Sequence, residues 1–177
     1  MDHSGGMSVP TNVELLLPEM RAYARSICQH EGAADDLVQD AVERFLKSTT
    51  APATLSDLRP WMFRVIRNLN FDELRKRRVR REYSAAVKRH SSSGATVPDH
   101  ARDVLIRIEY DKLPPEKREL LFLVDIMGLT YAEAADVMGV PDGTVMSRLS
   151  RARQALRAMV EIGTLADISR KTGMRGR

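Results

Sequence analysis

Arginine, serine and threonine side chains near the carboxyl end of the chain have the chemistry to contact a nucleic acid. At about 100° per residue, a helix over 143–160 places Val145, Leu149, Ala152, Leu156 and Met159 on one apolar stripe. The opposite face carries Thr144, Met146, Ser147, Ser150, Arg151, Gln154 and Arg157, with Arg148 and Arg153 beside it. Arginine can pair with guanine, and serine or threonine can reach bases or phosphates. A solvated arginine-rich helix has the same pattern, so this helix alone leaves both interpretations open.

The residues in front of this helix predict the element that would position it. Thr130 and Glu133 form a capping box that opens a short helix, and Gly139 ends it. Asp142 can cap the second helix, which is expected to start at Gly143. Small alanines in the short helix allow close helix approach. Two helices joined by a tight glycine turn predict a helix-turn-helix, whose second helix enters the DNA major groove.

A second group of cations lies in the middle of the chain. Six of the seven residues from Arg75 to Arg81 are lysine or arginine. One or two cations at a helix end are stabilised by about 0.3–1 kcal/mol each, but six exceed what capping requires. The run therefore favours contact with phosphates over a merely solvated helix end. The residues before it that are available to a core are Leu58, Trp61, Val65, Ile66, Leu69 and Leu74.

No catalytic or metal-binding constellation is recognisable in the sequence. The four histidines, His3, His30, His90 and His100, lack the spacing that places two imidazoles on one helix face. Cys28 is the only cysteine, which excludes an intrachain disulfide and favours a small packed residue over a redox sensor. We expect no enzymatic activity, no cofactor and no metal. With no apolar run of about 18 residues, the chain is expected to be cytoplasmic and without membrane insertion.

The remaining segments predict an all-α protein. Thr11 and Glu14 form a capping box for a helix from near Asn12 to about His30, with Pro18 in its first turns or at a kink. A second helix over 31–48 has the apolar stripe Leu37, Val38, Ala41, Val42, Phe45 and Leu46, and its acids suit a solvated face. Pro115 and Gly128 mark the start and end of another helix. The stretch 84–103 has the composition of a linker.

Taken together, these motifs resemble bacterial RNA polymerase sigma factors of the extracytoplasmic-function (ECF) type, in the sigma-70 family. "DDLVQDAVERFL" is similar to their polymerase-binding helix, "WMFRVIRNLNFDELRKRR" to their minus-ten segment, and the stretch from 113 to 156 to their minus-thirty-five reader. The resemblance implies two small helical domains on a flexible linker. It divides the chain into a disordered amino terminus 1–10, a region 2 domain 11–83, the linker 84–103, a region 4 domain 104–160 and a tail 161–177.

The resemblance also implies roles for individual residues. The surface for core RNA polymerase, through its β′ clamp helices, would be Asp36, Leu37, Gln39 and Asp40, which replaces the solvated-face interpretation of these acids. A loop over 68–72 would hold a flipped minus-ten base, and the expected minus-ten contacts are Arg44, Arg64, Arg67, Asn68, Asn70, Arg75, Arg77 and Arg78. The expected minus-thirty-five contacts are Thr144, Met146, Ser147, Arg148, Ser150 and Arg151.

Further partners implied by the family are the β flap of polymerase, promoter DNA and an anti-sigma factor. Met146 departs from the family, in which lysine or arginine is common there, so the sequence read at the minus-thirty-five element stays open. Two other functions also stay open: a dimeric helix-turn-helix regulator that acts without polymerase, and a sigma-like decoy that binds only proteins.

Overall fold

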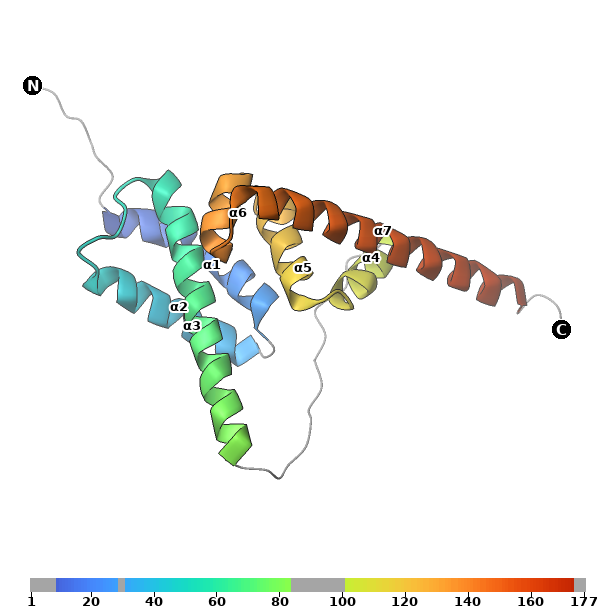
Figure 1. Ribbon diagram of the computed structural model, residues 1–177, viewed down its shortest axis with the longest axis horizontal. Coiled ribbons are helices and arrows are strands. Elements are labelled where there is room, and N and C mark those ends of the chain that lie inside the picture. Colours follow the sequence, from blue (N-terminus) through green and yellow to red (C-terminus); the bar gives the residue numbers. More distant parts are fainter. Residues whose placement is uncertain (1–8, 29–30, 84–100, 174–177) are drawn as a thin grey trace, which may run out of the picture.

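The computed structural model describes residues 9–28, 31–83 and 101–173, and helices joined by short connections make up most of these residues. The first half holds α1 (Val9–Ile27), α2 (Glu31–Lys47) and α3 (Leu55–Tyr83). The second half holds α4 (Ala101–Asp111), α5 (Pro115–Leu121), the π-helix η1 (Phe122–Ile126), α6 (Tyr131–Met138) and α7 (Asp142–Gly173). Figure 1 shows the two groups side by side. No strand occurs in the described residues, and the expected all-α fold class is confirmed.

The first half is a bundle in which α1, α2 and α3 each pack against the other two. Its centre consists of fully buried apolar side chains, among them Met20, Tyr23, Ala41, Met62 and Phe63. Thr54 caps α3, since its hydroxyl accepts from the backbone N–H of Asp57 at 3.3 Å. The side-chain amide of Asn12 donates to the carbonyl of Ala53 at 3.1 Å and ties the connection between α2 and α3 to α1.

Helix α1 differs from the expectation at its amino end. It begins at Val9, so Thr11 lies inside the helix and the predicted start near Asn12 is wrong. Pro18 also lies inside the helix, beyond the first turns. The Thr-x-x-Glu spacing of a capping box can also occur inside a helix. Here residues 9 and 10 extend α1 ahead of Thr11.

Helix α3 differs more from the predicted structure than α1 does. It runs without interruption for 29 residues, so the loop expected over 68–72 is wrong. The stretch contains neither glycine nor proline after Pro60, and the i,i+4 pair of Glu73 and Arg77 supports the helix beyond it at 2.9 Å. Two residues expected in the core are exposed, Leu74 at 38% and Leu46 at 68%. Leu74 lies beyond Ile66, the last buried one among the described side chains of α3, and Leu46 is rotated by about 100° from the buried Phe45 around α2.

The second half contains the predicted helix-turn-helix, formed by α6 and α7. Thr130 accepts from the backbone N–H of Glu133 at 3.2 Å while the Glu133 carboxylate accepts from the backbone N–H of Thr130 at 2.7 Å, which confirms the capping box. Gly139 ends α6 with a φ of 65°, a left-handed conformation that glycine adopts without steric cost. The backbone N–H of Val140 then donates to the carbonyl of Ala135 at 3.1 Å.

Two element boundaries of the second half differ from the predicted ones. Asp142 is the first residue of α7 and not its cap. At this position its carboxylate is stabilised by the positive end of the helix dipole. The helix expected from Pro115 to Gly128 changes to a π-helix at Phe122, where the backbone N–H of Met127 donates to the carbonyl of Phe122 at 2.8 Å. Gly128 nevertheless has the expected left-handed backbone, with a φ of 70°.

The segments between and beyond the two halves were expected to be a linker and a tail. Helix α4 already begins at Ala101, within the expected linker 84–103, and residues 84–100 lie outside the described ones. Helix α7 continues to Gly173, through most of the expected tail 161–177. Of the amino terminus 1–10, only the start of α1 is described. The division into domains stays a prediction.

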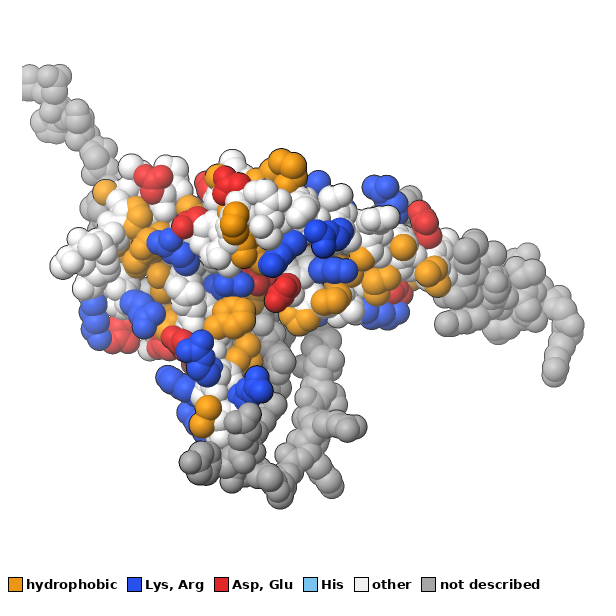
Figure 2. Space-filling model, viewed as in Figure 1, with side chains coloured by type: hydrophobic (Ala, Val, Ile, Leu, Met, Phe, Trp, Pro, Cys, Tyr) orange, Lys and Arg blue, Asp and Glu red, His pale blue; other side chains and the backbone are white. Residues whose placement is uncertain are grey.

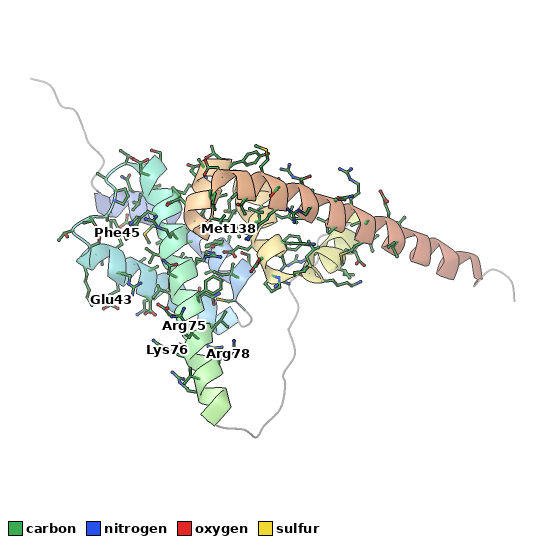
Figure 3. All side chains as sticks on the ribbon, viewed as in Figure 1. Glu43, Phe45, Arg75, Lys76, Arg78 and Met138 are labelled. Carbon is green, nitrogen blue, oxygen red and sulfur yellow. The ribbon has the colours of Figure 1, made fainter. Side chains whose placement is uncertain are left out.

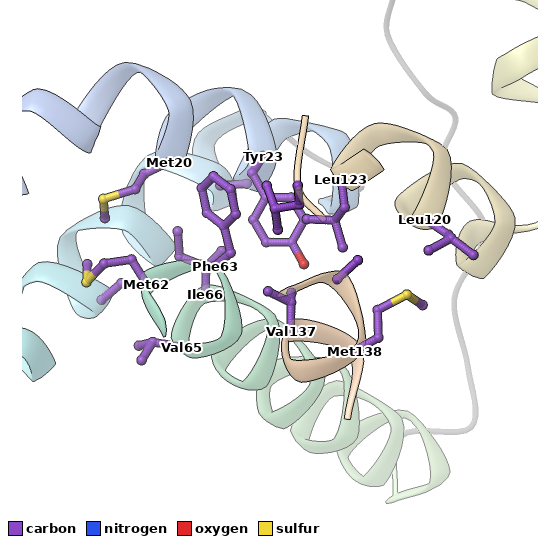
Figure 4. Close-up of a cluster of buried hydrophobic side chains, with 14 of the residues drawn as sticks. Met20, Tyr23, Met62, Phe63, Val65, Ile66, Leu120, Leu123, Val137 and Met138 are labelled. Atoms are coloured by element: carbon purple, nitrogen blue, oxygen red, sulfur yellow. The ribbon is translucent and has the colours of Figure 1, made fainter. Parts of the chain in front are cut away.

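The two halves pack against each other through an apolar cluster. Helix α3 contacts α6, while α1 contacts α5 and η1. In Figure 4, Tyr23 and Phe63 from the first half face Leu123 and Val137 from the second, and all four are at most 1% exposed. The Tyr23 ring lies 6.3 Å from that of Phe122, centroid to centroid. Among the described helices, none has both the length and the apolarity that a membrane span requires.

Candidate nucleic-acid interface

One face of α7 is anchored in the helix-turn-helix core and the opposite face is open. Val145, Leu149 and Ala152 are at most 1% exposed, as the apolar stripe predicted. The side chains expected to read the minus-thirty-five element lie on the other face, where Met146 is 59% exposed. Thr144 is half-buried, and Ser147, Arg148, Ser150 and Arg151 are exposed. The structure therefore brings this predicted set together on a single helix surface.

The arginines of α7 have different environments. Arg153 is tied to Asp125 of η1 by two hydrogen bonds, one of them from Nε at 3.2 Å, and these bonds raise the pKa of the Arg153 guanidinium. Arg148 lies 3.9 Å from the Glu116 carboxylate, at the edge of ion-pair range. Arg151 projects from the open face. Arg151 is thus the better placed of the three to meet a base edge.

A second cationic surface follows the distal half of α3. Arg75 and Arg78 are exposed here, as is Lys76, which belongs to the basic run but was not among the expected contacts. Figure 3 shows the three residues on the part of α3 that extends below α1 and α2, and Figure 2 shows lysine and arginine side chains gathered there and over α7. Arg77 pairs with Glu73, and Arg44 is exposed on α2.

Arg64 and Arg67, two expected minus-ten contacts, face the second half of the chain. Nη1 of Arg64 lies 2.5 Å from the Asp136 carboxylate of α6. Nε of Arg67 lies 2.9 Å from the Glu119 carboxylate of α5, and its guanidinium stacks 4.5 Å above the centre of the Phe71 ring. These two arginines are therefore already bound to carboxylates from the other half.

Asn68 and Asn70 lie within α3, so the structure does not place them in a shared loop. Asn68 is exposed. Asn70 is half-buried and its side-chain oxygen lies 4.0 Å from the Cys28 sulfur, a weak contact. Because residues two apart differ by about 200° around a helix, the two amides point to different sides. Of the two, Asn68 is the more exposed to solvent.

The expected polymerase surface lies on α2. Asp36, Gln39 and Asp40 are exposed, whereas Leu37 is only 7% exposed. Gln39 also lines a groove between α1 and α2, whose apolar floor is Leu17, Val38 and Val42 and whose rim carries Arg21, Arg25 and Asp35. An apolar floor with a charged rim suits contact with a protein better than binding of a small substrate.

Other expectations concern cysteine, tryptophan and metals. Cys28 is half-buried, and burial raises the pKa of its thiol to about 11, which disfavours the reactive thiolate. Trp61 packs edge-on against Phe45, with ring centres 6.3 Å apart. Among the described side chains, no group of three His, Cys, Asp or Glu is arranged to hold a metal ion. The four histidines lie outside the described residues.

The polar contact between the halves was not predicted from the sequence. Oη of Tyr23 donates to the Glu119 carboxylate at 2.7 Å, and the same carboxylate oxygen accepts from Arg67. Burial and the neighbouring Glu119 charge raise the pKa of the Tyr23 hydroxyl well above its usual value. Arg59 donates to the Met127 carbonyl and pairs with Glu19. In the sequence, Glu119 directly precedes Leu120 and Leu121, which are both buried. An acid beside such an apolar pair was the one feature that could have indicated a buried carboxylate.

Comparison with known proteins agrees with this arrangement of helices. Residues 13–80 match the family "Sigma-70 region 2", and residues 110–156 match "Sigma-70, region 4". The chain is 34% identical over 165 residues to the ECF RNA polymerase sigma factor EcfG of Rhodopseudomonas palustris, covering 90% of this chain and 89% of that one.

Two solved structures have a similar fold. The sigma factor RpoE of Bartonella quintana, in complex with the anti-sigma factor NepR, gives a TM-score of 0.74 at 28% identity, covering 86% of this chain and 96% of that one. CnrH, in complex with the cytosolic domain of CnrY, gives 0.58 at 26% identity, covering 86% and 89%. By its two matched regions and its similarity over nearly the whole length of EcfG, the chain belongs to the ECF RNA polymerase sigma factors of the sigma-70 family.

Proposed function

We propose that this chain binds core RNA polymerase and directs it to a dedicated set of promoters, as a specificity factor without enzymatic activity. In this proposal α2 contacts polymerase, α3 contacts the opened minus-ten element, and α7 reads the minus-thirty-five element in the major groove. The observation that carries the proposal is the two-faced α7, with Val145, Leu149 and Ala152 buried and Arg151 projecting from the open face.

The two DNA-contacting helices are proposed to divide the work. On α3, the cations Arg75, Lys76 and Arg78 would hold the phosphates of the separated strand, which positions the DNA without reading it. Asn68 would supply the contact to a base edge. On α7, Met146 offers only an apolar contact, for instance to a thymine methyl, so base reading would depend more on Arg151.

The proposed partner in regulation is an anti-sigma factor. The similar proteins RpoE and CnrH are described in complexes with NepR and CnrY. The groove between α1 and α2 and the exposed face of α7 are surfaces that such a protein could cover. Covering either surface would compete with polymerase or with DNA.

Reconstituted transcription tests the proposed function. The purified chain and core RNA polymerase are incubated with fragmented genomic DNA from the source organism, and transcript starts are mapped. Starts that depend on the chain and share two upstream elements are expected. Replacement of the exposed Asp40 by lysine should abolish polymerase binding, whereas Glu43→Gln, on the same helix and also exposed, should not.

Other results of the same experiment would favour other functions. Polymerase binding without chain-dependent starts would favour a decoy that binds only proteins. Duplex binding by a dimer, with no affinity for polymerase, would favour an ordinary helix-turn-helix regulator.

A further inference from the structure

We infer that Phe71 is a stacking platform for an unpaired base of the minus-ten element. The inference rests on the proposed contact of α3 with that element and adds a residue that was not among the expected contacts. Phe71 is 43% exposed, although phenylalanine is one of the residue types most often buried. Single exposed apolar side chains are common on proteins, so what surrounds the ring decides its role.

A cationic stripe runs along α3 with Phe71 at its centre. At about 100° per residue, five of the expected minus-ten contacts lie within about 60° of Phe71 around the helix: Arg64, Arg67, Asn68, Arg75 and Arg78. The two acids of this stretch, Asp72 and Glu73, lie about 100° and 160° away, so the stripe carries no carboxylate. It is about 21 Å long at 1.5 Å per residue, enough for several nucleotides of one strand. Figure 2 shows apolar side chains between the lysine and arginine side chains of this part of α3.

The Phe71 ring is fixed on one side and accessible elsewhere. The guanidinium carbon of Arg67 lies 4.5 Å from the ring centroid, over one face. The Arg67 side chain is itself only 16% exposed, so it limits the orientations of the ring. A cation covers one face of a phenyl ring, and the exposed remainder leaves surface on which a planar base can lie. A ring that is already ordered loses little conformational freedom when a base binds, which favours affinity.

The neighbours of Phe71 fit the other parts of a nucleotide. Asn68 is exposed one turn before the ring, and side chains three positions apart on a helix are about 5–6 Å apart at Cβ. A base on the ring would therefore present an edge to the Asn68 amide. Arg75, exposed one turn after the ring, would meet a flanking phosphate. Phe71 thus holds the base, Asn68 reads it and Arg75 positions the strand.

Two other aromatic residues of α3 are poorly placed for stacking. Phe63 is fully buried in the core. Trp61 is half-buried and packs edge-on against Phe45. Every base can stack on an aromatic ring, so Phe71 would stabilise the separated strand without selecting its sequence. Since only an unpaired base offers its face, the stack favours the opened promoter over the duplex.

Variants of Phe71 in the full-length chain, bound to core RNA polymerase, test the inference. Phe71→Ala removes the ring, Phe71→Leu keeps an apolar side chain without a flat face, and Phe71→Tyr keeps the flat face. Leu55→Ala is the matched control, because Leu55 is also exposed, at 38%, and lies about 160° from Phe71 around the same helix. Circular dichroism first shows that each variant keeps its helical content. Should Phe71→Ala unfold, Phe71→Leu carries the test.

Fluorescence anisotropy of each polymerase complex gives its affinity for a single-stranded oligonucleotide with the non-template minus-ten sequence of the mapped promoters. Phe71→Ala and Phe71→Leu should bind about 5- to 150-fold more weakly, the usual effect of losing one base–aromatic stack. Phe71→Tyr and Leu55→Ala should bind like the wild type. The slope of log K against log salt should stay unchanged in Phe71→Ala, whereas Arg75→Ala should reduce it by about 0.7.

Removal of single bases locates the stack. In a series of oligonucleotides, each minus-ten nucleotide is replaced in turn by an abasic one. At one position, the missing base should weaken binding of the wild type as much as Phe71→Ala does. The same oligonucleotide should bind Phe71→Ala no more weakly than the intact one, because the ring and the base contribute as a pair.

Three outcomes would overturn the inference. The first is wild-type affinity in Phe71→Ala. The second is wild-type affinity in Phe71→Leu, which would show an apolar contact and not a stack. The third is a loss in Phe71→Ala that is the same at every abasic position, as a merely structural role would give. If the wild-type complex neither binds the oligonucleotide nor starts transcription, the proposed function itself fails, which is a distinguishable result.

Discussion

Replacement of Arg151 by alanine should weaken minus-thirty-five recognition while leaving the fold intact. Arg151 lies on the exposed face of α7, whose position is fixed by the buried Val145, Leu149 and Ala152 on the other side. An exposed substitution of this kind changes the free energy of unfolding by at most about 0.5 kcal/mol. Loss of a base contact costs about 1–3 kcal/mol of binding free energy, which corresponds to roughly a 5- to 150-fold weaker promoter.

The assay compares the wild type and Arg151→Ala in the polymerase complex on a set of promoters mutated singly across the minus-thirty-five element. At the base pair that Arg151 reads, the variant should no longer discriminate, while discrimination at the other positions should persist. Arg153→Ala is the control, since this arginine, two residues further on, is bound to Asp125. With side chains 46% and 36% exposed, that pair should contribute at most about 1 kcal/mol to stability and nothing to promoter choice.

Two results would refute the assignment. Unchanged initiation on all promoters would show that Arg151 does not contact DNA. A uniform loss across promoters, with the slope of log K against log salt reduced by about 0.9, would show that Arg151 contacts a phosphate instead of a base.

Further predictions concern reactivity and stability. Burial raises the pKa of the Cys28 thiol from 9.0 to about 11, so at pH 8 iodoacetamide should alkylate the folded chain about 100-fold more slowly than the chain in urea, and the rate should rise about tenfold per pH unit up to pH 10; equal rates in both states would contradict this. Thr130→Ala removes the acceptor for the backbone N–H of Glu133 and should lower the free energy of unfolding by about 1 kcal/mol in urea titrations, with Thr130→Ser restoring it. Leu149→Ala, at a site 1% exposed, should cost about 2–5 kcal/mol in the same titration, and a loss below about 1 kcal/mol would show that α7 is not anchored there.

The sequence was most informative where structure depends on neighbouring residues. The capping box of Thr130 and Glu133 and the left-handed Gly139 involve partners within a few positions, and both were recognisable from spacing alone. The buried stripe of α7 follows from the helical period in the same way. Such local signals were sufficient to predict the helix-turn-helix and its open face.

The contact between the halves could not be predicted, because it joins residues that are remote in sequence. Tyr23 and Glu119 are 96 positions apart, and Arg64 and Asp136 are 72 apart. Nothing local tells a solvated arginine from one that meets a carboxylate of another helix. The prediction of a loop over 68–72 failed for a different reason. It came from the family resemblance and not from the residues themselves, whose pattern continues the helix.

The π-helix η1 makes the length of this segment more constrained than its composition. Phe122 stacks near Tyr23 on one side, while Asp125 binds Arg153 on another. Because a π-helical turn holds one residue more than an α-helical turn, deletion of one residue between 122 and 126 would restore a regular α-helix with the flanking segments nearly in register. Such a deletion would change the angle between Phe122 and Asp125 around the helix, whereas substitutions at the positions between them leave it unchanged. In an alignment of relatives, a gap at this position would therefore mark chains that have a regular α-helix here.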